Sequence, residues 1–238
     1  MNPHQQTPDE LFTGDPALDL MAKYAPRRGA SIEAMIRKYI LEDLPKPARV
    51  LEYGAGRGEF IFRFLGMEGV EMLASEIDNS YIDILKKRVK VFRSMDEIEG
   101  QLDGIFLIDV LEHIEDDGAA VREMYSKLRK GGRLFIYVPA RQELYSKFDK
   151  DVGHFRRYSL KQLMHTVEGA GFEVKKVRYH EILSYFAAGV TKILKRDDQF
   201  NPGAVKFYNN VVLPATSFIE RIIVPPIGKS LYLFAVKE

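Results

Sequence analysis

The sequence has no cysteine in its 238 residues, which excludes disulfide bonds, thiolate catalysis and Cys-ligated zinc or iron–sulfur sites. It also has almost no surplus of one charge, because 35 Lys and Arg residues are balanced by 34 Asp and Glu residues. A net charge of +1 gives no electrostatic case for nucleic-acid binding. Residues 1–13 lack the basic region and apolar run of a secretory signal. We therefore expect a cytoplasmic protein without a nucleic-acid partner.

The most apolar helical stretch, residues 182–194, is shorter than the run of about 20 residues that spans a bilayer. We predict a packed helix there, and an interfacial helix with peripheral membrane contact is the alternative. A second apolar stretch with aromatic residues runs from 207 to 224 and ends at Pro225 and Pro226. Together these stretches favour a binding partner with hydrophobic surface.

A chain of this length with 46% hydrophobic residues can bury a substantial core. Strand and helix patterns alternate from residue 49 to 176, which predicts a parallel sheet with helices on both faces. We expect one domain comprising an N-terminal helical segment 1–48, a core 49–180, a helical insertion 181–228 and a last strand 229–238. Within the first segment, apolar residues form one stripe over 31–40, with Ser31 as the candidate N-cap.

An apolar strand ends in three alternating glycines, Gly54, Gly56 and Gly58, before a helical pattern begins. Such glycines let the backbone turn tightly and approach a ligand, and the following helix offers free N–H groups. Glu59 stands where the dinucleotide fingerprint has glycine, which disfavours a pyrophosphate. Glu52 suits a ligand with a cationic amine. An ordinary tight turn is the alternative interpretation.

Two further strands end in polar residues. The strand 70–75 is followed by Glu76, at the distance at which ribose-binding acids occur, and a solvated acid near a helix N-terminus is the alternative. The strand 102–108 is followed by Asp109, Glu112 and His113. In an open α/β sheet these carboxyl ends face the ligand crevice. Asp78 is a candidate N-cap for a helix over 79–88.

Four blocks in this order carry a family resemblance. They are E-x-G-x-G-x-G at 52–58, the acid Glu76, D-V-L-E-H at 109–113 and L-R-K-G-G-R-L at 128–134. Over residues 49–176 the chain resembles the class I S-adenosylmethionine-dependent methyltransferases, and the G-H-F-R-R-Y segment at 153–158 looks like one bacterial and archaeal branch. The resemblance implies a doubly wound, mostly parallel seven-stranded sheet of Rossmann-like type. It also implies an antiparallel last strand over 230–236 with a helical insertion before it.

The resemblance also implies where the cofactor binds. Glu52, Gly54 and Gly56 would hold the methionine part of S-adenosylmethionine, Glu76 its ribose, and the residues around Met95 and Asp96 its adenine. The rest of the predicted cofactor wall consists of Ala55, Gly58, Ile77, Asp109, Val110 and His113. S-adenosylhomocysteine would be the product.

The acceptor side is predicted in the polar loop after the fifth strand. His154 is the candidate general base, and a structural histidine that orders the loop is the alternative. Arg156 and Arg157 could bind an acidic acceptor, unless they form internal salt bridges. Tyr145 and Tyr158 complete the predicted acceptor-binding residues. No spacing of histidines and acids indicates a metal site, so no metal is predicted.

The resulting prediction is methyl transfer to an oxygen or nitrogen atom of a small-molecule acceptor, hydrophobic or lipid-linked. A nicotinamide-dependent oxidoreductase on a similar sheet is one alternative. A non-catalytic S-adenosylmethionine-binding subunit is the other, since a fold does not fix a function.

Overall fold

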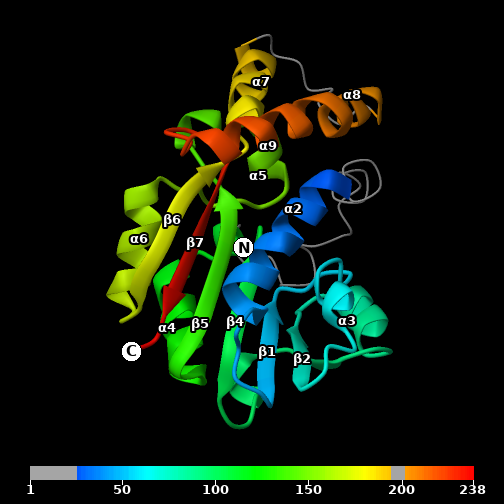
Figure 1. Cartoon of the computed structure of the whole chain (residues 1–238), viewed down its shortest axis with the longest axis vertical. Helices are drawn as coiled ribbons and strands as arrows, with labels where there is room; N and C mark the ends of the chain where they lie inside the picture. The colour runs from blue at the N-terminus through cyan, green and yellow to red at the C-terminus, as the bar shows by residue number, and fades with distance from the viewer. Residues whose placement is uncertain (1–25, 194–201) are drawn as a thin grey trace, which may run out of the picture.

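The computed structural model describes residues 26–193 and 202–238, so predictions about a leader sequence, His4 and residues 194–201 lie outside the described residues. Its centre is a seven-stranded sheet with the order β3-β2-β1-β4-β5-β7-β6 (Figure 1). The strands are β1 Ala48–Tyr53, β2 Val70–Ser75, β3 Lys90–Phe92, β4 Leu102–Ile108, β5 Leu128–Pro139, β6 Glu173–His180 and β7 Ser230–Val236. Strand β7 pairs antiparallel with β5 and β6, whereas β1 to β5 pair in parallel. The predicted fold class is confirmed.

The central strands explain why the sheet lies inside the molecule. Every residue of β4 except Ile108 is buried, which is typical of a parallel strand covered on both faces. The strand order reverses between β1 and β4, because β1 leads outward to β2 and β3 while β4 leads to β5. A ligand crevice is expected at the carboxyl ends of these two strands.

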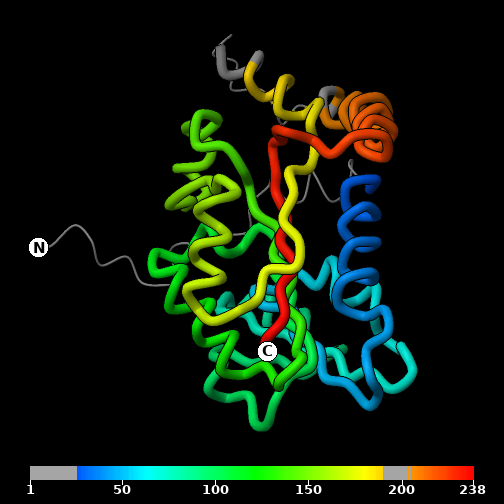
Figure 2. The backbone as a smooth tube through the Cα atoms, turned by 60° about the vertical axis from the view of Figure 1, so that its left-hand side comes forward, coloured from blue at the N-terminus to red at the C-terminus, as the bar shows by residue number. Residues whose placement is uncertain are grey.

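Helices cover both faces of the sheet. The α-helices of the described residues are α2 Pro26–Ile36, α3 Asn79–Leu85, α4 Asp117–Lys127, α5 Lys147–Asp151, α6 Leu160–Gly169, α7 Ile182–Ile193, α8 Pro202–Phe207 and α9 Leu213–Ile222. Figure 2 shows α2 on one face and α4 and α6 on the other. Accordingly, Ile32 and Ile36 of α2 belong to one buried cluster, and Met124 of α4 and Leu163 of α6 to the second.

Two local predictions about helices were wrong. Ser31 is not an N-cap, because α2 already begins at Pro26, and proline is favoured in the first turn of a helix. The helix expected after the glycine turn is only a 3-10 helix, Ile61–Phe64. Gly66 and Gly69 reverse the chain just beyond it with φ angles of 79° and 72°, which leaves no room for a longer helix before β2.

Asp78 is the N-cap of α3, as predicted, because its side chain accepts a hydrogen bond of 2.7 Å from the backbone N–H of Ser80. The helix itself ends at Leu85 rather than at residue 88.

The insertion between β6 and β7 lies above the carboxyl ends of the central strands. Helices α7, α8 and α9 form it, and Figure 1 shows them over the upper edge of the sheet. Two π-helical turns interrupt regular helix, Arg37–Leu41 after α2 and Tyr208–Val212 between α8 and α9. Within the described ranges, no helix combines the length and apolar character needed to cross a membrane.

Candidate active site

The glycine turn after β1 forms the floor of the site. Gly54, Gly56 and Gly58 have φ angles of 70°, 52° and 84°, in the left-handed region that favours glycine. A Cβ at Gly54 would lie 2.7 Å from the Val110 side chain, whereas a Cβ at Gly56 would meet no atom of the described residues within 4 Å, its chain neighbours apart. The turn therefore packs tightly against the end of β4 at Gly54 and faces open space at Gly56, as a ligand cradle requires.

Glu52 lies directly beneath this turn at the end of β1. Its carboxylate is buried and accepts a hydrogen bond of 2.7 Å from the backbone N–H of Ile61. Burial raises the pKa of Glu52 well above its usual value, and the charges of Glu59 and Glu76 act in the same direction. A cationic amine bound beside Glu52 would relieve that penalty, so this residue fits the amine of the predicted cofactor.

Glu76 connects the glycine turn to the end of β2. One carboxylate oxygen accepts a hydrogen bond of 2.7 Å from the backbone N–H of Gly56. The other accepts from the backbone N–H groups of Ile77 and Asp78, at 2.7 and 3.0 Å. These bonds hold the carboxylate at the carboxyl edge of the sheet. Its predicted role as a ribose ligand stays a prediction.

The predicted adenine residues lie in different surroundings. Met95 is buried in the core, and Asp96 is exposed in a 3-10 turn capped by the Ser94 hydroxyl. Ile77, beside Glu76, keeps 46% of its surface exposed. Ala55 is buried under the glycine turn. Contact of these residues with the cofactor stays a prediction.

At the carboxyl end of the neighbouring strand, Asp109 follows β4 with a φ angle of 53°, a left-handed conformation that aspartate tolerates better than most residues. Its carboxylate forms an ion pair of 2.7 Å with Arg28 of α2. Arg28 also lies 3.4 Å from the carboxylate of Glu181, which follows β6 and is fully buried. Burial by itself would raise the pKa of Glu181, but the charges of Arg28 and Lys229 outweigh it and lower the pKa to about 2.

Further polar side chains surround this ion pair. The Tyr208 hydroxyl donates to Glu181 at 2.7 Å, and the Tyr137 hydroxyl lies 2.9 Å from Nδ1 of His180. We call Arg28, Asp109, Tyr137, His180, Glu181 and Tyr208 the polar chamber. It draws on α2, the ends of β4, β5 and β6, and the π-helical turn of the insertion.

The sequence analysis missed most of the polar chamber. Of its residues, only Asp109 was predicted at the site. Tyr137 and His180 could have been predicted, because each is a polar residue at the carboxyl end of a predicted strand. Nothing local marks Arg28, because its partners are distant in sequence.

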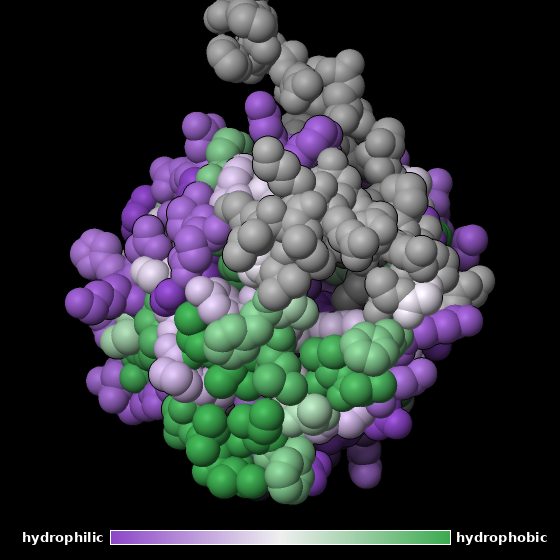
Figure 3. Space-filling view, turned by 90° about the horizontal axis from the view of Figure 1, so that it is seen from above, coloured by the Kyte–Doolittle hydropathy of each residue, from purple (hydrophilic) through white to green (hydrophobic). Residues whose placement is uncertain are grey.

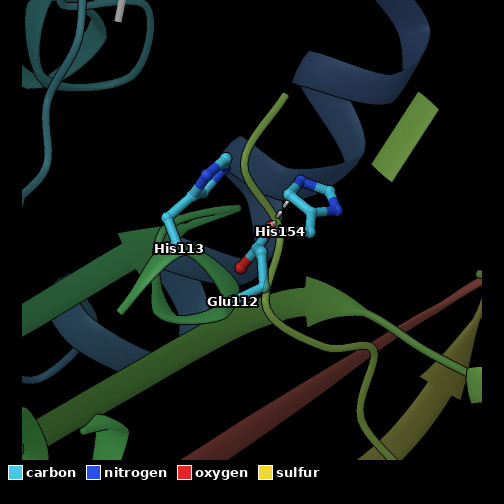
Figure 4. A group of neighbouring side chains, drawn as sticks. All are labelled: Glu112, His113 and His154. Atoms are coloured by element: carbon cyan, nitrogen blue, oxygen red, sulfur yellow. Dashed lines mark ion pairs between the residues drawn. The ribbon is translucent and has the colours of Figure 1, made fainter. Parts of the chain in front are cut away.

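The loop after β5 forms the other wall. His154 keeps only 10% of its side chain exposed, and its Nδ1 lies 2.9 Å from the buried carboxylate of Asp149. Asp149 also accepts a hydrogen bond of 2.8 Å from Nε of Arg157. Burial by itself would raise the pKa of Asp149. The hydrogen bond from His154 and the charge of Arg157 outweigh that effect and bring the pKa well below its usual value. His154 is therefore held rigidly, with Nε2 directed toward Glu112 at 3.8 Å (Figure 4).

Both arginines of this loop have internal partners. Arg157 is buried against Asp149, and Arg156 forms an ion pair of 3.0 Å with Asp117. Asp117 also accepts a hydrogen bond of 2.7 Å from the buried hydroxyl of Tyr158. These contacts match the internal salt-bridge alternative, and acceptor binding by Arg156, Arg157 and Tyr158 stays a prediction.

Tyr145 donates a hydrogen bond of 2.6 Å to the backbone oxygen of His154. It thus positions the loop, and its predicted contact with the acceptor stays a prediction. His113 lies against His154 with ring centroids 4.6 Å apart. Burial, and secondarily His154, lowers the pKa of His113 to about 4.

An open doubly wound sheet with a glycine cradle, a buried acid beneath it and a second acid at the next strand end defines a Rossmann-like nucleotide-cofactor enzyme. The family model of a methyltransferase domain matches residues 24–177. The chain therefore belongs to the class I S-adenosylmethionine-dependent methyltransferases, and S-adenosylmethionine is the cofactor of this family. No curated protein sequence matches the chain.

Solved structures agree on the fold. A methyltransferase from Archaeoglobus fulgidus is 22% identical, with a TM-score of 0.60 over 94% of this chain and 100% of that one. A possible histamine N-methyltransferase from Thermotoga maritima is 18% identical, with a TM-score of 0.58 over 93% and 100%. Phosphoethanolamine N-methyltransferase 2 from Haemonchus contortus, in complex with S-adenosylmethionine, is 15% identical, with a TM-score of 0.59 over 89% and 52%.

Proposed function

We propose that this methyltransferase acts on an oxygen or nitrogen atom of a small acceptor with a substantial hydrophobic part, such as a lipid-linked molecule. The observation that carries the proposal is the apolar character of the insertion above the cleft. Figure 3 shows apolar side chains gathered on the face seen from above. The apolar roof, as we call it, consists of the exposed residues Phe186, Phe207, Phe218, Ile222, Ile223 and Val224.

The apolar roof and the polar chamber would each contact a different part of the acceptor. A cluster of exposed apolar side chains is typical of an interaction surface, whereas single exposed apolar residues are common on any protein. Below them, Arg28 and Asp109 offer a cation and an anion that can orient a polar reacting group. An acceptor with an apolar body and a polar end fits both features.

The chain's own residues bind and align the reactants. When bound, S-adenosylmethionine supplies an activated methyl group, and S-adenosylhomocysteine remains after transfer. The turn at Gly56, together with Glu52 and Glu76, would hold that cofactor against the ends of β1 and β2. The polar chamber would hold the acceptor in line, while the insertion excludes water. An acceptor O–H or N–H must also lose its proton, and Nε2 of His154 is the nitrogen predicted to take it.

The test uses a series of acceptors that share one phenol or amine group and differ in alkyl length. With labelled S-adenosylmethionine, each methylene that reaches the roof should raise kcat/KM by up to about fourfold, since burying one methylene contributes about 0.8 kcal/mol. The double variant Phe218→Ser with Ile222→Ser should flatten this dependence. Ile84→Ser, on exposed α3, is the matched control.

A kcat/KM independent of alkyl length would contradict the hydrophobic acceptor. Binding of S-adenosylhomocysteine without transfer to any acceptor would instead support the non-catalytic alternative. A cytoplasmic location stays a prediction.

A further inference from the structure

Glu112, His113 and His154 bring three ligand-type side chains together near the carboxyl end of β4 (Figure 4). Glu112 and His113 lie on the 3-10 turn Leu111–His113 that follows β4, and His154 follows α5. One carboxylate oxygen and one nitrogen from each ring all lie within 4.8 Å of one another. The sequence predicted no metal site, because the two segments are distant in the chain and only the fold joins them.

Glu112 shows that this cluster is incomplete as a set of protein groups. Its side chain is fully buried, and neither carboxylate oxygen has a hydrogen-bond partner within the described part of the chain. The nearest basic atom is Nε2 of His154 at 3.8 Å, which is beyond hydrogen-bond distance. A buried carboxylate in this state is costly unless a cation or a proton compensates it.

His154 is already oriented as a ligand. Its Nδ1 is hydrogen-bonded to the carboxylate of Asp149 at 2.9 Å, which fixes the proton on Nδ1 and leaves the lone pair on Nε2. Metal-binding histidines in proteins almost always have such an outer carboxylate or carbonyl partner. Asp149 is held in turn by Arg157 and by the backbone N–H of Ser146. The lone pair of Nε2 therefore has a fixed direction toward Glu112.

We propose that Glu112, His113 and His154 bind a divalent transition-metal ion at the wall of the acceptor cleft. Two imidazoles and one carboxylate are a ligand set for Zn²⁺ and for Fe²⁺, Mn²⁺ or Co²⁺. Ligand atoms on such an ion lie about 3 to 3.5 Å apart, so the side chains need to close by only about 1 to 2 Å. Three protein ligands leave positions for an exogenous oxygen.

The consequence for catalysis rests on the proposed function. An acceptor oxygen on the open position would become more acidic, so the metal would favour the nucleophilic form of a hydroxyl group. Nε2 of His154 then coordinates the ion, so the hydroxyl proton would pass to bulk water instead of to this nitrogen. The residue would act on the acceptor through the metal.

The first test measures metal binding without catalysis. Full-length protein is freed of metal with a chelator and titrated with Zn²⁺ by calorimetry and with Co²⁺ by visible absorption. We expect about one ion per chain, cobalt bands in the visible range and a higher Tm on binding. Glu112→Gln should weaken binding by about 100-fold or more while keeping the size of the side chain. The exposed His165→Gln variant is the control and should bind like wild type.

Further measurements distinguish a loss of metal binding from a loss of folding and from a loss of methyl transfer. Glu112→Gln keeps the size of the buried side chain and removes a carboxyl group that has no hydrogen-bond partner in the described part of the chain. In the metal-free state its Tm should therefore be at least that of wild type. Equal Zn²⁺ affinity in wild type and Glu112→Gln, or no binding in either, would overturn the metal site. Methyl transfer by metal-free protein would overturn only the catalytic role of the ion. Metal binding with no transfer to any acceptor would leave the site in place and refute the proposed function.

Discussion

Gly56→Ala separates the cradle role of this glycine from its effect on folding. Residue 56 has a φ angle of 52°, so an L-residue there is strained by about 1 to 2 kcal/mol. Among the described residues beyond its two chain neighbours, no atom lies within 4 Å of the added methyl group, so no clash with them adds to this cost. We expect the free energy of unfolding to fall by about that amount and the fold to remain intact.

The effect on cofactor affinity should be larger than this backbone effect alone explains. If the open space at Gly56 receives S-adenosylhomocysteine, the methyl group overpacks the bound complex. Overpacking costs about 1 to 3 kcal/mol, which corresponds to roughly 5- to 150-fold in Kd. We expect a loss of at least about fivefold for Gly56→Ala, and a greater loss for Gly56→Val.

Calorimetric titration with S-adenosylhomocysteine measures the affinity, and urea unfolding measures stability. Gly66→Ala is the matched control, because Gly66 has a φ angle of 79° and also no atom within 4 Å of an added Cβ. It should lose similar stability and keep wild-type affinity. Wild-type affinity in Gly56→Ala would refute the cradle, and an equal loss in Gly66→Ala would assign the effect to general destabilisation.

Three further predictions concern stability. Arg28→Met removes the ion-pair partner of buried Glu181, leaving Lys229 as a more distant cation, and should lower the free energy of unfolding by about 3 to 5 kcal/mol at pH 7. The difference should shrink as pH falls from 4.5 to about 2, because the variant protonates Glu181 early in this range and wild type loses the ion pair as pH approaches 2. Burial raises the pKa of Glu220 from 4.5 to about 7, so wild type should lose stability as pH rises through this range. Relative to wild type, Glu220→Gln should therefore gain about 1 to 3 kcal/mol between pH 4 and 8. Gly228→Ala places a Cβ 2.2 Å from the backbone oxygen of His180 and should cost about 3 kcal/mol or more.

Chemical denaturation across pH tests all three. Arg37→Met is the control for Arg28→Met, because Arg37 forms an exposed pair with Glu33 and should cost less than about 1 kcal/mol. Gly169→Ala controls for Gly228→Ala, since its added Cβ meets no atom within 4 Å. Equal losses in either pair, or a Glu220→Gln difference that stays constant with pH, would refute the reasoning.

Local sequence determined the sheet and its cofactor side. Apolar runs of strand length, each ended by a glycine or an acid, predict parallel strands whose carboxyl ends share one edge. Gly54, Gly56, Glu52 and Glu76 were predicted because strand ends, turns and left-handed glycines are short-range properties of the chain. The antiparallel β7 came from family resemblance, since nothing local gives a strand its direction in a sheet.

Tertiary structure alone decided the acceptor side. Arg28 meets Asp109 and Glu181, and His154 meets Glu112, because the strand order brings loops that are distant in sequence to the same edge. The same packing gave Arg157 an internal partner in Asp149. A side chain's hydrogen-bond partners and burial depend on these long-range contacts, whereas strand and turn propensities depend on neighbours in the chain. The sequence by itself therefore determined the fold and the glycine turn, and only the fold brought together the charges for which we propose contact with the acceptor.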